Sequence, residues 1–253
     1  LIQKNEELIE LLKEKRKSLI SHMVTKGLNP EVRMKDSQVE WIGNIPEHWI
    51  TGRLGVDCRI KARLGWKGLK ASEYVDEGYI FLSTPNIKEY DIDFKNVNYI
   101  TEERYLESPE IMLENGDVLL AKDGSSLGIS NVIRVLPSEV TVNSSIAVIR
   151  PRNNIDGIYL HYFLSSNYMQ NIIQRMKDGM GVPHLFQADM RKFTILKPPI
   201  EEQEEIAMYI DRETSKIEFL IDKIQNQVEL LKEYKISIIS NAVTGKIDLR
   251  GNN

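Results

Sequence analysis

A helical segment occurs twice in this chain, and the repeat constrains the architecture more than any other feature. The first copy covers residues 10–25 and the second covers residues 229–244, so the offset is a constant 219 residues. The core of the first copy reads ELLKEKRKSLIS, and the core of the second reads ELLKEYKISIIS. We therefore expect one kind of helix on each side of a different, central structure.

Apolar residues in the second copy recur in alternating steps of four and three, the heptad period of helices that wrap around each other. This seam consists of Ile217, Ile221, Ile224, Val228, Leu231, Ile238 and Ala242, with polar Lys235 as the exception. At the repeat offset, the first copy contributes Ile2, Asn5, Ile9, Leu12, Arg16, Leu19 and Met23. The pattern favours a coiled-coil spacer whose polar positions fix the register. Two amphipathic helices packed on a globular core remain an alternative, and the pattern does not say which helix pairs with which.

Breaks in the periodicity divide the chain into five parts. Gly27 and Gly245 end the two helices, and Pro198-Pro199 separates the last helix from what precedes it. Because the chain begins inside a helical pattern at Leu1, we expect a fragment of a longer polypeptide or a half-size subunit. The predicted parts are a first helical spacer (1–26), an ordered linker (27–45), a recognition domain (46–199), a second helical spacer (200–245) and a tail (246–253).

Composition excludes several classes of protein. Hydrophobic residues make up 42% and charged residues 28% of the chain, and no apolar run approaches the roughly 20 residues of a membrane span. Cys58 is the only cysteine, which fits a reducing cytoplasm and excludes a thiolate metal cage. The four histidines have no ligand spacing, and no glycine fingerprint for a nucleotide cofactor is present. The net charge of −4 restricts any DNA binding to a local patch.

The central domain contains short apolar runs bounded by turn residues, which is typical of strands. These runs are residues 79–82, 117–121, 131–135 and 145–149. Between residues 156 and 176, the spacing of apolar residues favours helix instead. We therefore predict a mixed α/β domain between long, coiled-coil-forming helices.

A basic stretch covers residues 58–70 and contains five cations and no acid. Two glycines and an aromatic residue interrupt it, so the stretch suits a loop that follows phosphate groups. The alternative is an ordinary solvated loop, but the rest of the domain is close to neutral, which favours a function. The candidate DNA contacts in this stretch are Lys61, Arg63, Trp66, Lys67 and Lys70.

An Asp-Gly pair between apolar runs predicts a hairpin around residues 119–128. Its tip presents Lys122, Asp123, Ser125 and Ser126. Lysine donates to guanine, aspartate accepts from cytosine, and serine bonds to either, so the tip suits base reading. A purely structural hairpin and a Ser/Lys hydrolase using Lys122 and Ser125 are the alternatives. No oxyanion motif accompanies the Ser/Lys pair, which makes the hydrolase the weakest hypothesis.

Two further loops carry candidate DNA contacts. Asn86 and Lys88 follow one predicted strand and suit adenine or backbone contacts. His184 and Gln187 lie in or beside a glycine-rich stretch that lacks the Lys-Ser/Thr ending of a phosphate-binding P-loop.

Several segments together resemble the specificity subunits of Type I restriction–modification systems. They are the helix of residues 10–25, WIGNIPEHW at 41–49, Gly65-Trp66, KDGS at 122–125 and KPPIEEQ at 197–203. The resemblance covers essentially the whole chain. The family combines two target-recognition domains with two helical regions, and this chain has one such domain with a helical region on each side. The resemblance therefore implies a C-terminal half or a half-size version.

The resemblance implies a non-catalytic subunit that reads one half of a bipartite site in double-stranded DNA. The helices would set the distance between half-sites and dock methyltransferase subunits. The resemblance assigns no cofactor to this chain; S-adenosylmethionine, ATP and Mg belong to the methyltransferase and restriction subunits. A second recognition half would complete the reader. A coiled-coil interaction scaffold, with a globular domain that does not bind DNA, is the competing function.

Overall fold

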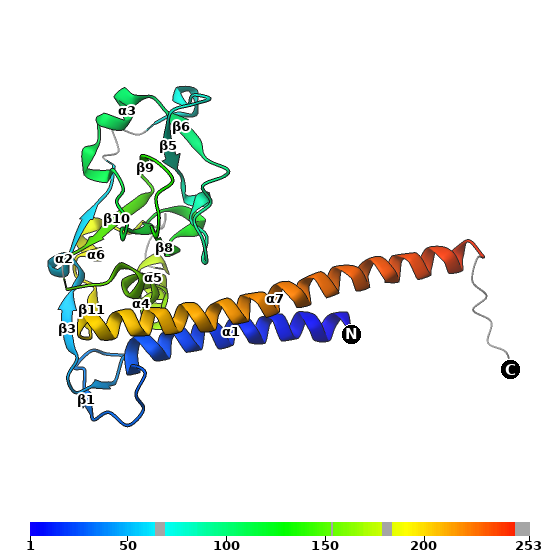
Figure 1. The fold of residues 1–253 in the computed structure, drawn as a ribbon, viewed down its shortest axis with the longest axis horizontal. Helices are drawn as coiled ribbons and strands as arrows, with labels where there is room; N and C mark the ends of the chain where they lie inside the picture. Colours follow the sequence, from blue (N-terminus) through cyan, green and yellow to red (C-terminus); the bar gives the residue numbers. More distant parts are fainter. Residues whose placement is uncertain (64–68, 153, 179–183, 246–253) are drawn as a thin grey trace. The chain divides into compact units, whose positions relative to one another are not determined.

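The computed structural model describes residues 1–63, 69–152, 154–178 and 184–245 (Figure 1). The chain divides into two compact units. Leu1–Leu19 and Tyr209–Asn253 form a helical unit, and Ile20–Met208 form a central unit. The predicted linker and recognition domain fall within the central unit. Among the described residues, no helix is long and apolar enough to cross a membrane.

Two long helices, α1 (Ile2–Lys26) and α7 (Ile200–Val243), contribute to the helical unit. Within this unit they run antiparallel, because Glu6 pairs with Lys232 at 2.7 Å while Arg16 pairs with Glu218. This pairing answers the question that the heptad pattern left open. The side chain of Arg16 is only 3% exposed, so the polar seam position found in the sequence is occupied by an ion pair.

The seam is packed most tightly in the middle of the helical unit. Ile9, Ile217 and Ile221 form a buried cluster, against which Leu12 and Ile224 pack. Val228 is also buried, whereas Leu19 and Leu231 are half-buried. Ile238 is exposed, because the antiparallel register carries the end of α7 beyond the start of α1.

A four-stranded antiparallel sheet lies at the centre of the second unit, with the order β4–β10–β7–β8. In the register of this sheet, Ile149 of β10 lies opposite Ile60 of β4 on one side and Val118 of β7 on the other. Every residue of β7 is buried, which matches its continuous apolar run. The strands are β4 (Cys58–Lys61), β7 (Val118–Ala121), β8 (Ser130–Val132) and β10 (Ile146–Pro151).

A second sheet of three strands has the order β6–β5–β9, with β5 parallel to β9. Its strands are β5 (Tyr79–Leu82), β6 (Asn98–Ile100) and β9 (Val140–Val142). Leu82 and Val142 from this sheet share one core cluster with Leu119 and Val148 from the four-stranded sheet. The two sheets are therefore held together by a common apolar core rather than by strand pairing.

Smaller elements complete the central unit. Two two-stranded sheets pair β1 (Met34–Asp36) with β2 (Asn44–Pro46), and β3 (Ile50–Arg53) with β11 (Thr194–Lys197). The short helices are α2 (Leu54–Asp57), α3 (Glu102–Leu106), α4 (Gly157–Ser165), α5 (Asn167–Asp178) and α6 (Gln187–Met190), and the 3-10 turns are η2 (Ala71–Glu73), η3 (Thr84–Asn86), η4 (Pro109–Ile111) and η5 (Gly124–Ser126).

The mixed α/β fold with long terminal helices is confirmed, and two details differ from the sequence-based expectation. The helical region predicted for residues 156–176 is two helices, because Ser166 adopts an extended backbone between α4 and α5. Of the run at 131–135, only Asn131 and Val132 belong to a strand, β8. The hairpin predicted around residues 119–128 is present between β7 and β8, and it turns through η5, where Gly124 has a φ of +71° that favours glycine.

The first turn of α7 is tied to the rest of the central unit by Gln203, whose side chain is fully buried. Its carbonyl oxygen accepts from the Asp156 backbone at 2.9 Å, and its amide donates to the carbonyls of Asn154 and Pro198. On the other helix, Gly27 ends α1 at a φ of +76°, as predicted. A side chain at Gly27 would meet Trp49, which is also fully buried.

Candidate nucleic-acid interface

Several of the predicted contact segments meet at one end of the four-stranded sheet. Strands β4 and β7 both run antiparallel to β10, so they run parallel to each other, and their C-terminal ends lie at the same end of the sheet. Lys61 is the last residue of β4, and Lys122 directly follows β7. The basic stretch and the β7–β8 hairpin therefore both leave the sheet at this end.

The segment that contains His184 is held at the same end of the sheet by Asp123. Asp123 and His184 form an isolated antiparallel bridge, and the Leu185 backbone donates to the carbonyl of Lys122 at 2.8 Å. The carboxylate of Asp123 also bonds to His184 Nδ1 and accepts from Lys122 Nζ at 3.0 Å. The β7–β8 hairpin and the segment of His184, which the sequence analysis treated as separate candidates, are thus parts of one surface.

The surroundings of Asp123 favour its charged form. Burial raises the pKa of this carboxyl group, but the hydrogen bonds and charges of Lys122 and His184 outweigh burial and hold the pKa below its usual range. The same contact occupies Lys122, whose side chain is only 10% exposed. Because the Nζ of Lys122 donates to Asp123, the geometry does not support a Ser/Lys hydrolase that uses Lys122 and Ser125.

Polar and aromatic groups are exposed around this bridge. Ser125 is exposed at the tip of the hairpin, and Ser126 is half-buried. Gln187, also half-buried, is the first residue of α6. Phe186 is 51% exposed, and its ring lies T-shaped to the His184 ring at a centroid distance of 4.4 Å. The surface combines hydroxyl, amide, carboxylate and aromatic groups, which suits contact with base edges and sugars.

Arg63 lies inside the protein rather than on the loop surface, since it is only 3% exposed. Its Nε donates to the carbonyl of Val142 and its Nη1 to the hydroxyl of Ser108, both at 3.3 Å. The guanidinium lies 5.8 Å from the centre of the Phe81 ring. Burial, and then the nearby charge of Arg104, lower the pKa of Arg63. Arg63 therefore fixes the start of the basic loop to the three-stranded sheet.

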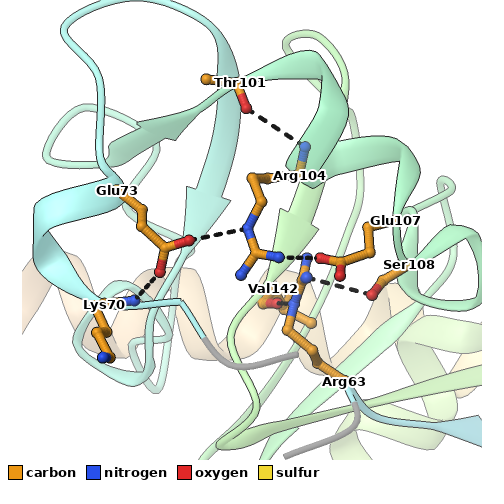
Figure 2. A network of polar contacts seen from close by, with 8 residues as sticks. All are labelled: Arg63, Lys70, Glu73, Thr101, Arg104, Glu107, Ser108 and Val142. Atoms are coloured by element: carbon orange, nitrogen blue, oxygen red, sulfur yellow. Dashed lines mark hydrogen bonds and ion pairs between the residues drawn. The ribbon is translucent and has the colours of Figure 1, made fainter. Parts of the chain in front are cut away.

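A network around Arg104 supports the basic stretch on its other side (Figure 2). Arg104, on α3, pairs with Glu73 at 3.2 Å and with Glu107. Glu73 also accepts a hydrogen bond from the backbone nitrogen of Lys70 at 2.8 Å. Lys70 itself is exposed, so the network holds its backbone and leaves its ammonium group at the surface. The sequence reasoning missed Arg104 because its acidic partners are distributed over two separate segments.

The segment after β5 contains one buried and one exposed candidate. Asn86 is 6% exposed, and its amide donates to the carbonyls of Asp93 and Asn96 while its oxygen accepts from the Ser83 backbone. Lys88 is exposed, and its carbonyl accepts from the Asn131 side chain on β8 at 2.9 Å. Asn86 thus shapes this loop, and Lys88 lies on the surface beside the four-stranded sheet.

The remaining predicted contacts, Trp66 and Lys67, lie outside the described residues. In the described part of the chain, no group of three or more His, Cys, Asp and Glu side chains is placed to hold a metal ion.

Comparison with known proteins identifies the family. The family model described as "Type I restriction modification DNA specificity domain" matches residues 69–230. The chain therefore belongs to the Type I restriction–modification DNA specificity domain family. The match includes most of the central unit and the greater part of α7.

Individual relatives agree with this assignment. The chain is 25% identical over 249 residues to the MjaVIII specificity subunit of Methanocaldococcus jannaschii, covering 97% of this chain and 56% of that protein. The HsdS subunit of Thermoanaerobacter tengcongensis has a similar fold, with a TM-score of 0.63, 19% identity and coverage of 97% of this chain and 54% of that one. A chain from a study of the assembly of a type I restriction–modification system gives a TM-score of 0.71 at 19% identity, covering 95% of this chain and 53% of that one. This chain thus spans about half the length of the relatives that it matches.

Proposed function

We propose that this chain is a non-catalytic DNA-recognition subunit, or half of one, in a Type I restriction–modification complex. Its central unit reads one part of a bipartite site in double-stranded DNA. The convergence of Lys61, Asp123 and His184 at one end of the four-stranded sheet carries this proposal, because it joins three predicted DNA-contacting segments into one surface. The family match supports it independently.

The candidate contacts divide into two chemical groups. Lys61, Lys70 and Lys88 are partly or fully exposed cations suited to backbone phosphates. Ser125, Ser126 and Gln187 carry the hydrogen-bonding groups suited to base edges, with Asp123 and His184 beside them. Trp66 and Lys67 stay in the proposal as loop contacts. In this scheme the buried residues Arg63, Asn86 and Lys122 act by holding the three loops in place.

The two long helices have a different proposed task. A rigid antiparallel pair fixes the separation between this reading unit and a second one, and therefore the spacing of the two half-sites. The second unit is another copy of the chain or the other half of a longer subunit.

The helices also offer a docking surface for methyltransferase subunits, and restriction subunits join the complete complex. In this proposal, S-adenosylmethionine, ATP and Mg serve those partner subunits in the cytoplasm.

The test is salt-dependent binding of the chain to a fluorescent duplex of mixed sequence. The triple variant Lys61→Gln, Lys70→Gln, Lys88→Gln neutralises three cations of the proposed surface and should weaken binding. The negative slope of log affinity against log salt should become shallower by up to about 2.7, since each phosphate contact contributes about 0.9. The matched control neutralises three exposed lysines of α7, Lys216, Lys223 and Lys235, and should leave the slope nearly unchanged.

Two outcomes would contradict the proposal. If the wild-type chain binds the duplex no better than it binds heparin, and shows no sequence preference among duplexes, the scaffold function gains support. If the triple variant and the α7 control lower the slope equally, binding follows total charge and the assigned surface is wrong.

A further inference from the structure

Three arginines line a groove at the opposite end of the four-stranded sheet from the loops described above. The groove has a volume of about 660 Å³ and is lined by Arg59, Arg150, Arg152, Glu114, Pro151 and Asn154. Arg59 lies near the start of β4, and Arg150 and Arg152 lie at and just beyond the end of β10. None of these arginines is among the contacts predicted from the sequence.

Arg59 and Arg150 are direct partners across the antiparallel pair β4–β10. Cross-strand partners have side chains on the same face, and like charges directly opposite each other are destabilising. Arg150 is compensated by the buried carboxylate of Asp117, which accepts from its Nε at 2.7 Å and from its Nη2 at 2.8 Å. Glu114 also pairs with Arg150. The side chain of Arg150 is therefore fixed in the wall of the groove.

The other two arginines have no such compensation. Arg59 and Arg152 are exposed, and within the described residues neither has a carboxylate partner. The backbone of Arg152 is nevertheless held, because its nitrogen donates to the carbonyl of Asp57 at 3.1 Å and its carbonyl accepts from Ile155. Two exposed guanidinium groups that line an open groove offer planar, bidentate donors for an oxyanion such as a phosphate.

We propose that this arginine groove binds a backbone phosphate of the DNA duplex; this inference rests on the proposed function. Arg59 and Lys61 are two residues apart on β4, so their side chains share one face of this edge strand. β4 therefore leads from the groove to the proposed reading surface, with exposed Arg59 near its start and half-buried Lys61 at its end. β10 connects the two ends of the sheet over about 17 Å at 3.4 Å per residue. One duplex, whose major groove is about 12 Å wide, can therefore place base edges at the loops and a flanking phosphate at the groove.

A phosphate contact and a base contact differ in how their loss affects binding. The double variant Arg59→Gln, Arg152→Gln should weaken binding to all duplex sequences by a similar factor and leave the preference between sequences unchanged. The magnitude of its salt slope should fall by about 0.9, because the one phosphate contact made at the groove is lost. The matched control, Lys223→Gln with Lys235→Gln on α7, makes the same change in net charge and should leave the slope nearly unchanged. Both arginines are exposed, so the thermal melting temperature should stay within a few degrees of wild type and verify the fold.

The outcomes separate this inference from the proposed function. If wild type binds duplex DNA with a sequence preference but the double variant keeps the wild-type slope, the groove proposal is overturned and the proposed function stands. If the variant keeps that slope but loses binding to a purified methyltransferase subunit, the groove is a protein-docking site and the phosphate assignment is wrong. If wild type binds no duplex, the proposed function and the groove proposal fail together.

Discussion

The carboxylate of Asp123 is bonded to the imidazole of His184, although 61 residues separate them in the sequence. This contact joins the β7–β8 hairpin to the segment before α6 and brings two candidate recognition loops together. The same carboxylate accepts a hydrogen bond from Lys122 Nζ at 3.0 Å, so the side chains of Lys122 and His184 both contact Asp123. The positions of both loops consequently depend on Asp123.

Replacing Asp123 by Asn should lower stability in a pH-dependent manner. The pKa of Asp123 is below its usual value in the folded protein, so its stabilisation is present above the unfolded pKa of about 3.9. It is lost as the pH falls through the folded pKa. We expect the Asp123→Asn variant to lose about 1 kcal/mol in unfolding free energy at pH 7 and to approach wild type toward pH 3. Urea unfolding monitored across this range measures the difference.

The control for this effect is Asp76→Asn, which removes an exposed carboxylate from the same unit. It should change the unfolding free energy by less than about 0.5 kcal/mol at pH 7. A constant difference between Asp123→Asn and wild type from pH 7 to pH 3 would show that the charge of Asp123 does not stabilise the bridge.

Replacing Arg104 by Gln should disturb the support of the basic loop. The guanidinium pairs with Glu73 and Glu107, and Glu73 in turn holds the backbone of Lys70. We expect a loss of about 1–2 kcal/mol in unfolding free energy and weaker duplex binding, because two carboxylates lose a charged partner. Urea unfolding and fluorescence anisotropy measure the two effects. Glu103→Gln, an exposed neighbour on α3, should alter neither, and equal effects from both variants would refute the support role.

The antiparallel helix pair predicts strong coupling between Arg16 and Glu218. Single and double alanine variants of these residues should yield a coupling energy of about 1–3 kcal/mol, because the arginine side chain is almost fully buried. The exposed pair of Glu6 and Lys232 is the matched control on the same two helices and should give about 0–1 kcal/mol. Coupling at Arg16 no larger than at the control pair would contradict the buried ion pair between Arg16 and Glu218.

Cys58 should be chemically silent in the folded protein. Burial, followed by the nearby charge of Asp57, raises the pKa of its thiol to about 12. Because the chain has one cysteine, labelling with a thiol-specific disulfide reagent at pH 8 reports this residue alone. We expect negligible reaction in buffer and one equivalent in urea. Rapid stoichiometric labelling of the native protein would mean that the start of β4 is not buried as described.

The sequence is most informative where the pattern is local. The steps of four and three through Ile217, Ile221 and Ile224 predicted the seam of the long helix, because one face of a helix can be read from residue spacing. Gly27 and the Pro198-Pro199 pair likewise indicated helix ends. The antiparallel pairing could not be predicted, because a heptad pattern states which residues face a partner but not which partner they face.

The interface was harder to predict because its geometry depends on contacts far apart in the chain. Arg63 and Lys122 were expected at loop surfaces on account of their charge, yet the structure buries them against Ser108 and Asp123. Their partners become visible only once the sheets have formed. One local signal was available: the alternation through Arg59 and Lys61 places both cations on one face of a strand.

The most direct test of the central claim is selection of bound duplexes from a randomised pool by the complete chain. The recognition proposal predicts enrichment of a short, defined base pattern. It also predicts that Ser125→Ala with Gln187→Ala relaxes this pattern while overall affinity falls only modestly, because phosphate contacts remain. If wild type enriches no base pattern at any salt concentration at which it binds DNA, the claim that this chain reads sequence is contradicted.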